Sequence, residues 1–119
     1  MLTDGTTTLT AATADPGYSA SRTTDISAEE VSGTNYTAGG ETMTITWGES
    51  SGTVTFDDTS TPTWSTHASA PNDARYGVVY NDTATNKPAV CYIDLGGVID
   101  IQTGDLTITW SGSGIFTLS

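Results

Sequence analysis

Apolar and polar residues alternate with a period of two in several short runs of this chain. In the run 42–47, Met43, Ile45 and Trp47 alternate with threonines, and the run 54–56 repeats the pattern after a turn-like stretch. Such alternation is typical of a strand with one buried face. The two runs therefore predict a hairpin in which Met43, Ile45 and Trp47 face the core.

The segment from Ala74 to the end of the chain continues the pattern. Runs 74–80 and 89–95 predict paired strands joined by a loop over 81–88, and Gly96-Gly97 predicts a turn. Further on, 106–110 and 115–118 predict a second hairpin, closed by 111–114. The polar stretch 57–73 contains Trp64, which we expect to pack on the core as a strand or a lid.

These runs predict an all-β fold, a small antiparallel β-sandwich or barrel of about six to eight short strands. Composition agrees: Thr is the commonest residue, Gly follows it, and Lys, Leu and Glu are scarce. With 119 residues, the chain has the size of one domain. We assign residues 25–119 to a single β-domain.

Residues 1–24 carry few apolar anchors, namely Leu2, Leu9 and Tyr18, and include a turn signal at 15–17. The sequence predicts an irregular N-terminal arm or a loosely held strand here. Ser27 and Glu30 have the spacing of a capping box, which predicts one helical turn at most.

Charge narrows the classes of partner. Fourteen acidic residues against three basic ones give a formal net charge of −11. Arg22, Arg75 and Lys87 cannot form the basic patch that nucleic acid or an anionic membrane requires, so we expect neither partner. The start of the chain lacks the features of a signal peptide, and no run approaches the length of a membrane span.

Two motifs raise the question of catalysis. Gly48-Glu-Ser-Ser-Gly52 matches the G-x-S-x-G pattern of hydrolases, but it leads into a strand rather than a helix, which favours a hairpin turn. His67, the one histidine, lies in a polar stretch with no evident nucleophile partner, so we expect an exposed loop residue. The sequence predicts no catalytic residue and no enzyme.

Metal or cofactor binding has equally little support. One histidine and one cysteine cannot supply a zinc site, and we expect Cys91 to be a small buried hydrophobic residue without a disulfide partner. The carboxylates that could gather around Ca²⁺, or form a glycosidase pair, are Asp57, Asp58, Asp94, Asp100 and Asp105. No calcium-loop spacing joins them, so we expect turn and strand-end roles, with no metal and no cofactor.

Two further sets of residues have structural readings. Asn35 and Asn81 begin glycosylation sequons, which we interpret as accidental matches in turn-like sequence. The tryptophans Trp47, Trp64 and Trp110 could form a ligand platform. For Trp47 and Trp110, which are in phase with apolar neighbours, burial in the core or in an interface is the favoured interpretation.

Several sequence blocks of the chain stand out together. They are VSGTNYTAGGETM (31–43), ARYGVVYNDT (74–83), NKP (86–88), YIDLGG (92–97) and LTITW (106–110), with GIFTL at 114–118. In this order the blocks resemble a widespread family of small virion proteins of tailed bacteriophages. The resemblance covers roughly residues 29–119. Such proteins often begin with an extra Lys-containing apolar strand, whereas here Leu2-Thr-Asp4 follows Met1 directly.

The resemblance implies a non-enzymatic structural role. We expect a capsid decoration (cement) protein that forms a homotrimer, is made in the host cytoplasm and is seated on the outer capsid surface. Its partner would be the major capsid protein, and residues 1–24 would be a contact arm that orders on binding. The alternative is a tail or head-fibre adhesion module that binds a host surface glycan or protein.

Overall fold

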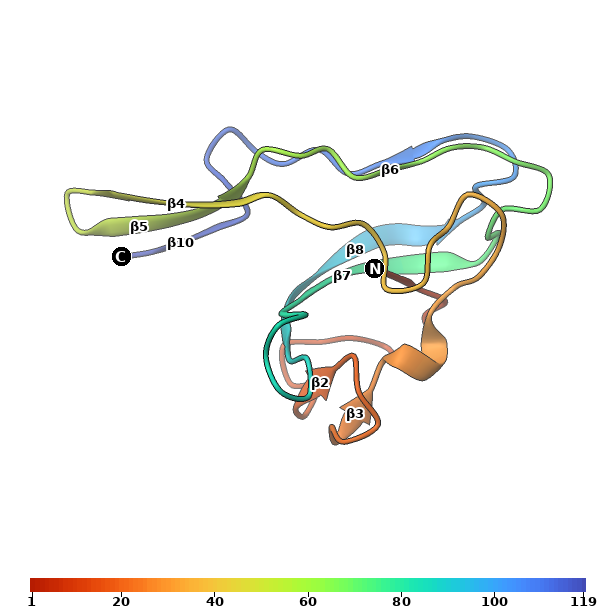
Figure 1. The fold of residues 1–119 in the computed structure, drawn as a ribbon, viewed down its shortest axis with the longest axis horizontal. Coiled ribbons are helices and arrows are strands. Elements are labelled where there is room, and N and C mark those ends of the chain that lie inside the picture. The colour runs from red at the N-terminus through yellow and green to blue at the C-terminus, as the bar shows by residue number, and fades with distance from the viewer.

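The computed structural model describes residues 1–119 and confirms the all-β class (Figure 1). Ten strands and one single-turn 3-10 helix, η1 (Ser27–Glu29), make up the regular structure, and five of the strands span two residues. The strands are β1 (Leu2–Thr3), β2 (Pro16–Gly17), β3 (Thr24–Asp25), β4 (Ile45–Ser50), β5 (Thr53–Asp58), β6 (Thr63–Trp64), β7 (Ala74–Tyr80), β8 (Ala89–Ile99), β9 (Leu106–Thr107) and β10 (Phe116–Leu118).

The central element is an antiparallel sheet in the order β1–β7–β8. β7 is buried on both faces, since Tyr76 and Val78 contact one core cluster and Ala74 another. The N-terminal segment with β2 and β3 covers one face, and β6 with β9 lies on the other (Figure 1). This layering divides the core into two small clusters.

For residues 1–24 the sequence predicts an irregular arm or a loosely held strand, and at the start of this segment the arm is wrong because the chain forms strand β1. Leu2 and Thr3 pair with Gly77 and Tyr76 of β7, and Leu2 is fully buried. The Met1 ammonium donates a hydrogen bond to the Val78 carbonyl, and its burial lowers the pKa of this amine to about 6. Residues 1–3 are therefore part of the central sheet rather than a free arm.

The turn expected at Gly96-Gly97 is also wrong, because β8 runs through both glycines. Gly96 adopts a positive φ of 81°, which a glycine reaches without strain. The pairing passes from Tyr76–Asp94 to Ala74–Ile99, so four residues of β8 lie opposite one of β7. The glycines thus form a large bulge inside a long strand rather than ending it.

The hairpin expected from 106–110 and 115–118 does not form. β9 pairs with β6, whereas β10 pairs with β5 in a three-stranded sheet of order β10–β5–β4. A bridge between Ser111 and Gly114 still turns the chain between them. Trp64 is buried in strand β6 against the core, as expected.

The β10–β5–β4 sheet projects from the rest of the molecule (Figure 1). Its β4–β5 hairpin confirms the predicted pairing, with the turn at Ser51 and Gly52. The molecule is correspondingly elongated, with extents of 48 × 31 × 25 Å. The structure contains no helix with the length and apolarity of a membrane span.

Candidate functional site

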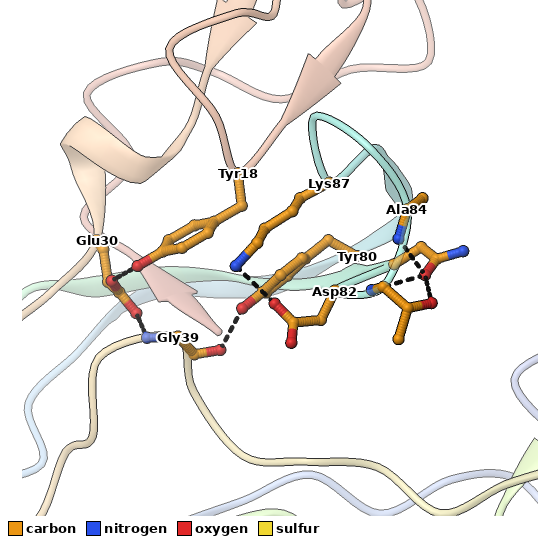
Figure 2. Close-up of polar contacts among 9 residues, drawn as sticks. Tyr18, Glu30, Gly39, Tyr80, Asp82, Ala84 and Lys87 are labelled. Carbon is orange, nitrogen blue, oxygen red and sulfur yellow. Dashed lines mark hydrogen bonds and ion pairs between the residues drawn. The ribbon is translucent and has the colours of Figure 1, made fainter.

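A polar cluster surrounds Glu30, next to the central sheet (Figure 2). The Glu30 carboxylate accepts hydrogen bonds from the Tyr18 hydroxyl (2.7 Å), the Tyr36 hydroxyl (2.8 Å) and the Gly39 amide (2.6 Å). The Tyr80 hydroxyl donates to the Gly39 carbonyl, and the Tyr18 and Tyr80 rings stack with centroids 4.9 Å apart. The cluster joins segments distant in sequence to β7.

This arrangement replaces the capping box expected at Ser27–Glu30. η1 has Ile26 at its N-cap and no side-chain capping bond, and the Ser27 hydroxyl donates to Asp25 instead. The predicted single turn is confirmed. The Glu30 side chain, however, is turned toward the two tyrosines rather than back to its own helix.

The cluster shifts the pKa of three tyrosines upward. The hydrogen bond to Glu30, with burial and the Glu30 charge, raises the pKa of Tyr18 to about 12. Burial is the main cause for Tyr36, supported by its bond to Glu30, and burial with the Asp82 charge raises the pKa of Tyr80. Ionising any of these hydroxyls would place a negative charge near the carboxylate of Glu30 or Asp82.

These shifts predict loss of stability at high pH. A tyrosine whose pKa is higher in the folded state stabilises the fold fully below its unfolded pKa of about 10. For Tyr18 that contribution is lost as the pH rises through about 12. Urea midpoints followed together with tyrosinate absorbance should fall over this window, and the Tyr18→Phe variant should fall less. A wild-type midpoint that is constant across the window would contradict the prediction.

All three Lys and Arg side chains of the protein form ion pairs within it. Arg22 contacts Asp15, Arg75 contacts Asp94, and the Lys87 ammonium lies 2.7 Å from an Asp82 oxygen. Lys87 also approaches the Tyr18 ring, 5.4 Å from its centroid (Figure 2). The hydrogen-bonding and charged groups around Glu30 are therefore paired with one another, and the role of this cluster is structural.

The two catalytic motifs are separate from each other. The segment 48–52 forms the tip of the β4–β5 hairpin, where Glu49 accepts a hydrogen bond from the Gly52 amide, which confirms the predicted turn. His67 is exposed in a loop, as predicted, and accepts a hydrogen bond from the Ser69 amide through Nδ1. The structure does not bring the histidine and a serine of the hairpin together.

The candidate carboxylates are also dispersed. Asp94 pairs with Arg75, which lowers its pKa, and the Thr66 amide does the same for Asp105. Asp100 accepts from the Gln102 amide in a turn, while Asp57 accepts from the Asp58 amide. No three His, Cys, Asp or Glu side chains gather in a way that could hold a metal ion.

Asp58 ends β5 and accepts backbone amides there, as expected of a strand-end residue, but its burial and its bond to Trp110 were not predicted. Its carboxylate is buried and accepts hydrogen bonds from the Thr44 amide (2.8 Å), the Ser60 amide (3.0 Å) and hydroxyl (2.5 Å), and the Trp110 indole (3.0 Å). Burial opposes ionisation, but these bonds outweigh it and lower the pKa of Asp58. Asp58 thus fixes the base of the projecting hairpin to the segment that follows β9.

Cys91 lines an apolar cavity of about 360 Å³ beside β8. The N-terminal segment contributes Leu9 and Ile26 to its wall, and β8 contributes Val90 and Tyr92. Cys91 is half-buried rather than fully buried, and burial raises the pKa of its thiol. A raised pKa keeps the thiol protonated, so it is a weak nucleophile.

The sequon asparagines both serve local structure. The Asn35 amide donates to the Ser65 carbonyl, and Asn81 accepts from the Thr83 and Ala84 amides in the turn that follows β7. Figure 2 shows the Ala84 contact beside the Lys87–Asp82 pair. These contacts account for the turn-forming residues without reference to glycosylation.

The tryptophans occupy three different environments. Trp64 is buried, and Trp110 is partly buried with its indole bonded to Asp58. Trp47 is 63% exposed, so its expected place in the core is wrong. Its edge meets the Phe56 ring at a centroid distance of 4.6 Å, and Phe56 stacks on Phe116 at 4.8 Å.

The strongest candidate for an interaction surface is the aromatic face of the projecting sheet. Pairing places Trp47 and Phe116 on either side of Phe56, and Glu49 and Leu118 on either side of Val54. Leu118 is 60% exposed. A sheet with an apolar face normally buries it against another element, and here the end of that face lacks such cover.

Comparison with protein-family models, with curated proteins and with solved structures yields no match to this chain.

Proposed function

We propose that this chain is a non-enzymatic structural protein of a tailed-bacteriophage virion. In this role it decorates the outside of the capsid and bridges capsomers by binding the major capsid protein. The projecting sheet is the observation that carries the proposal, because its exposed Trp47 and Leu118 gain most if another protein covers them. A sheet that protrudes from a small domain suits a bridging role.

The charge distribution supports an outer position. The net charge is −11, and all three Lys and Arg side chains are held in ion pairs within the chain. Such a surface is repelled by packaged nucleic acid. We assign the protein to the outer surface of the capsid, after synthesis in the host cytoplasm.

Self-association as a homotrimer belongs to the same proposal. The outer edge of the central sheet is formed by β8, which spans eleven residues and carries exposed apolar side chains at Val90, Tyr92 and Val98. A long edge strand of this kind offers backbone groups and apolar surface to another copy. Oligomerisation would also stabilise a domain whose core is divided into two small clusters.

Binding to empty capsid shells tests the proposed function. Purified chain should co-sediment with shells stripped of their own decoration protein, and should saturate at hundreds of copies per shell. Binding should follow the exposed shell surface and should not require DNA. Failure to co-sediment at any concentration below aggregation would overturn the proposal.

A tail or head-fibre adhesion module is the second candidate, favoured by the exposed indole of Trp47. A tryptophan face on a projecting element can also stack on a glycan. An adhesin would be present in few copies and confined to the tail or to fibres. Densitometry of purified particles against the major capsid protein separates the two roles.

A further inference from the structure

The projecting sheet has two chemically different faces. Its apolar face carries Ile45, Trp47, Val54, Phe56, Phe116 and Leu118 in register across the three strands. The opposite face carries threonine side chains from all three strands, with Asp57 beside them. Exposure of the apolar face to water is unfavourable, so this face gains free energy when another surface covers it.

We infer that this sheet inserts its apolar face into a groove of another protein, and that Lys or Arg side chains border this groove. The inference rests on the proposed function only in taking the partner to be part of the capsid shell.

Charge favours a different protein over a second copy of this chain. Glu49 lies on the apolar face opposite Val54, and the β10–β5–β4 sheet contains no Lys or Arg. Two copies facing each other through this surface would bring acidic groups together, and neither sheet would supply a cation to offset them. A basic border on the partner would instead complement Glu49 and the net charge of −11.

The size of the sheet favours a groove over a flat contact. Strands about 4.8 Å apart, with about 3.3 Å per residue, give a face of roughly 240 Å² for two strands of six residues and one of three. A stable protein–protein interface needs roughly 800 Å² from each partner. The sheet reaches that area only if the partner encloses its edges and its threonine face as well as the aromatic one.

Variants of the exposed apolar residues test the inference in the shell-binding assay. Trp47→Ser and Leu118→Ser should each weaken binding to stripped shells, Trp47→Ser by about 30-fold, as for a central aromatic anchor. Ala68→Ser is the control, since Ala68 is exposed and lies outside both the projecting sheet and the β8 edge. It should bind within about twofold of wild type, and circular dichroism should show all three variants folded.

Salt and Glu49 provide the second arm of the test. Raising NaCl from about 0.05 to about 0.5 M should weaken wild-type binding several-fold, and Glu49→Gln should reduce that salt dependence. Asp73→Asn, which removes an exposed acid elsewhere, should leave it unchanged. Equal salt dependence in both variants would overturn the basic border.

Three outcomes would overturn the docking surface, and one separate outcome concerns the proposed function. Folded Trp47→Ser and Leu118→Ser variants that bind shells as wild type does would overturn the docking surface and leave the capsid role standing. A lower oligomeric state of Trp47→Ser in sedimentation velocity would assign the face to a second copy. Glycan-array binding that Trp47→Ser abolishes would assign it to a sugar. Absence of wild-type binding to shells would instead overturn the proposed function.

Discussion

Replacing Glu30 with alanine is expected to lower the free energy of unfolding by about 3 kcal/mol, because hydrogen bonds to a charged acceptor are strong and their loss strands partly buried donors. The variant removes the acceptor of the Tyr18 and Tyr36 hydroxyls and of the Gly39 amide. Tyr36 also accepts a hydrogen bond from the Leu2 amide, so the loss should reach β1. Urea unfolding monitored by tryptophan fluorescence measures the change.

Asp73→Ala is the control, since Asp73 is exposed and its side chain makes no hydrogen bond. It should change the free energy of unfolding by about 0.5 kcal/mol or less. If Glu30→Ala is as stable as Asp73→Ala, the structural role of the Glu30 cluster is wrong.

Replacing Asp58 with asparagine is expected to cost about 2–3 kcal/mol of stability, because a buried carboxylate loses charge-assisted hydrogen bonds. Oδ1 accepts from the Thr44 and Ser60 amides, and Oδ2 accepts from the Ser60 hydroxyl and the Trp110 indole. An asparagine has one acceptor oxygen and one NH2 group. In either orientation the NH2 group replaces an oxygen that accepts hydrogen bonds in the wild type, so those donors lose their acceptor. Chemical denaturation measures the loss, and a change in Trp110 fluorescence should accompany it.

A double-mutant cycle with Trp110→Phe makes this prediction specific. Phenylalanine removes the indole N–H, so Asp58→Asn should cost less in that background than in wild type. Asp73→Asn, on an exposed acid without hydrogen bonds, should have little effect in either background. Additive effects of Asp58→Asn and Trp110→Phe would show that the two side chains do not depend on each other.

The strands that follow from local pattern are the ones the sequence predicts well. Run 74–80 matches β7, and the hairpin of β4 and β5 forms with its bounds shifted by a few residues. In both cases the apolar run and its neighbouring turn signals specify the element without help from distant residues.

The prediction errors arise where the structure depends on contacts between residues that are far apart in the sequence. Ser111–Gly114 does turn the chain, but β10 finds its partner in β5, some sixty residues earlier, rather than in β9. The alternation of apolar and polar residues likewise predicts that Trp47 lies on the apolar face of its strand. It does not predict whether other segments of the chain pack over that face. Because the hairpin projects, that cover is missing at Trp47.

The long-range contacts of Glu30 and Asp58 could not be predicted from the sequence for a related reason. Glu30 fits a local capping pattern, and its long-range contacts to Tyr18, Tyr36 and Gly39 have no signature in sequence spacing. Asp58 ends the alternating strand β5, and its sequence position predicts only a strand-end role. Only the contact with Trp110, which lies 52 residues further along the chain, shows that it is a buried anchor.

Imaging of the intact virion tests the central claim most directly. A cryo-electron microscopy reconstruction should show this β-domain on the outside of the capsid in hundreds of copies, with its projecting β10–β5–β4 sheet inserted between or against capsomers. Density for the domain confined to the tail or fibres, or its absence from the shell, would contradict the account.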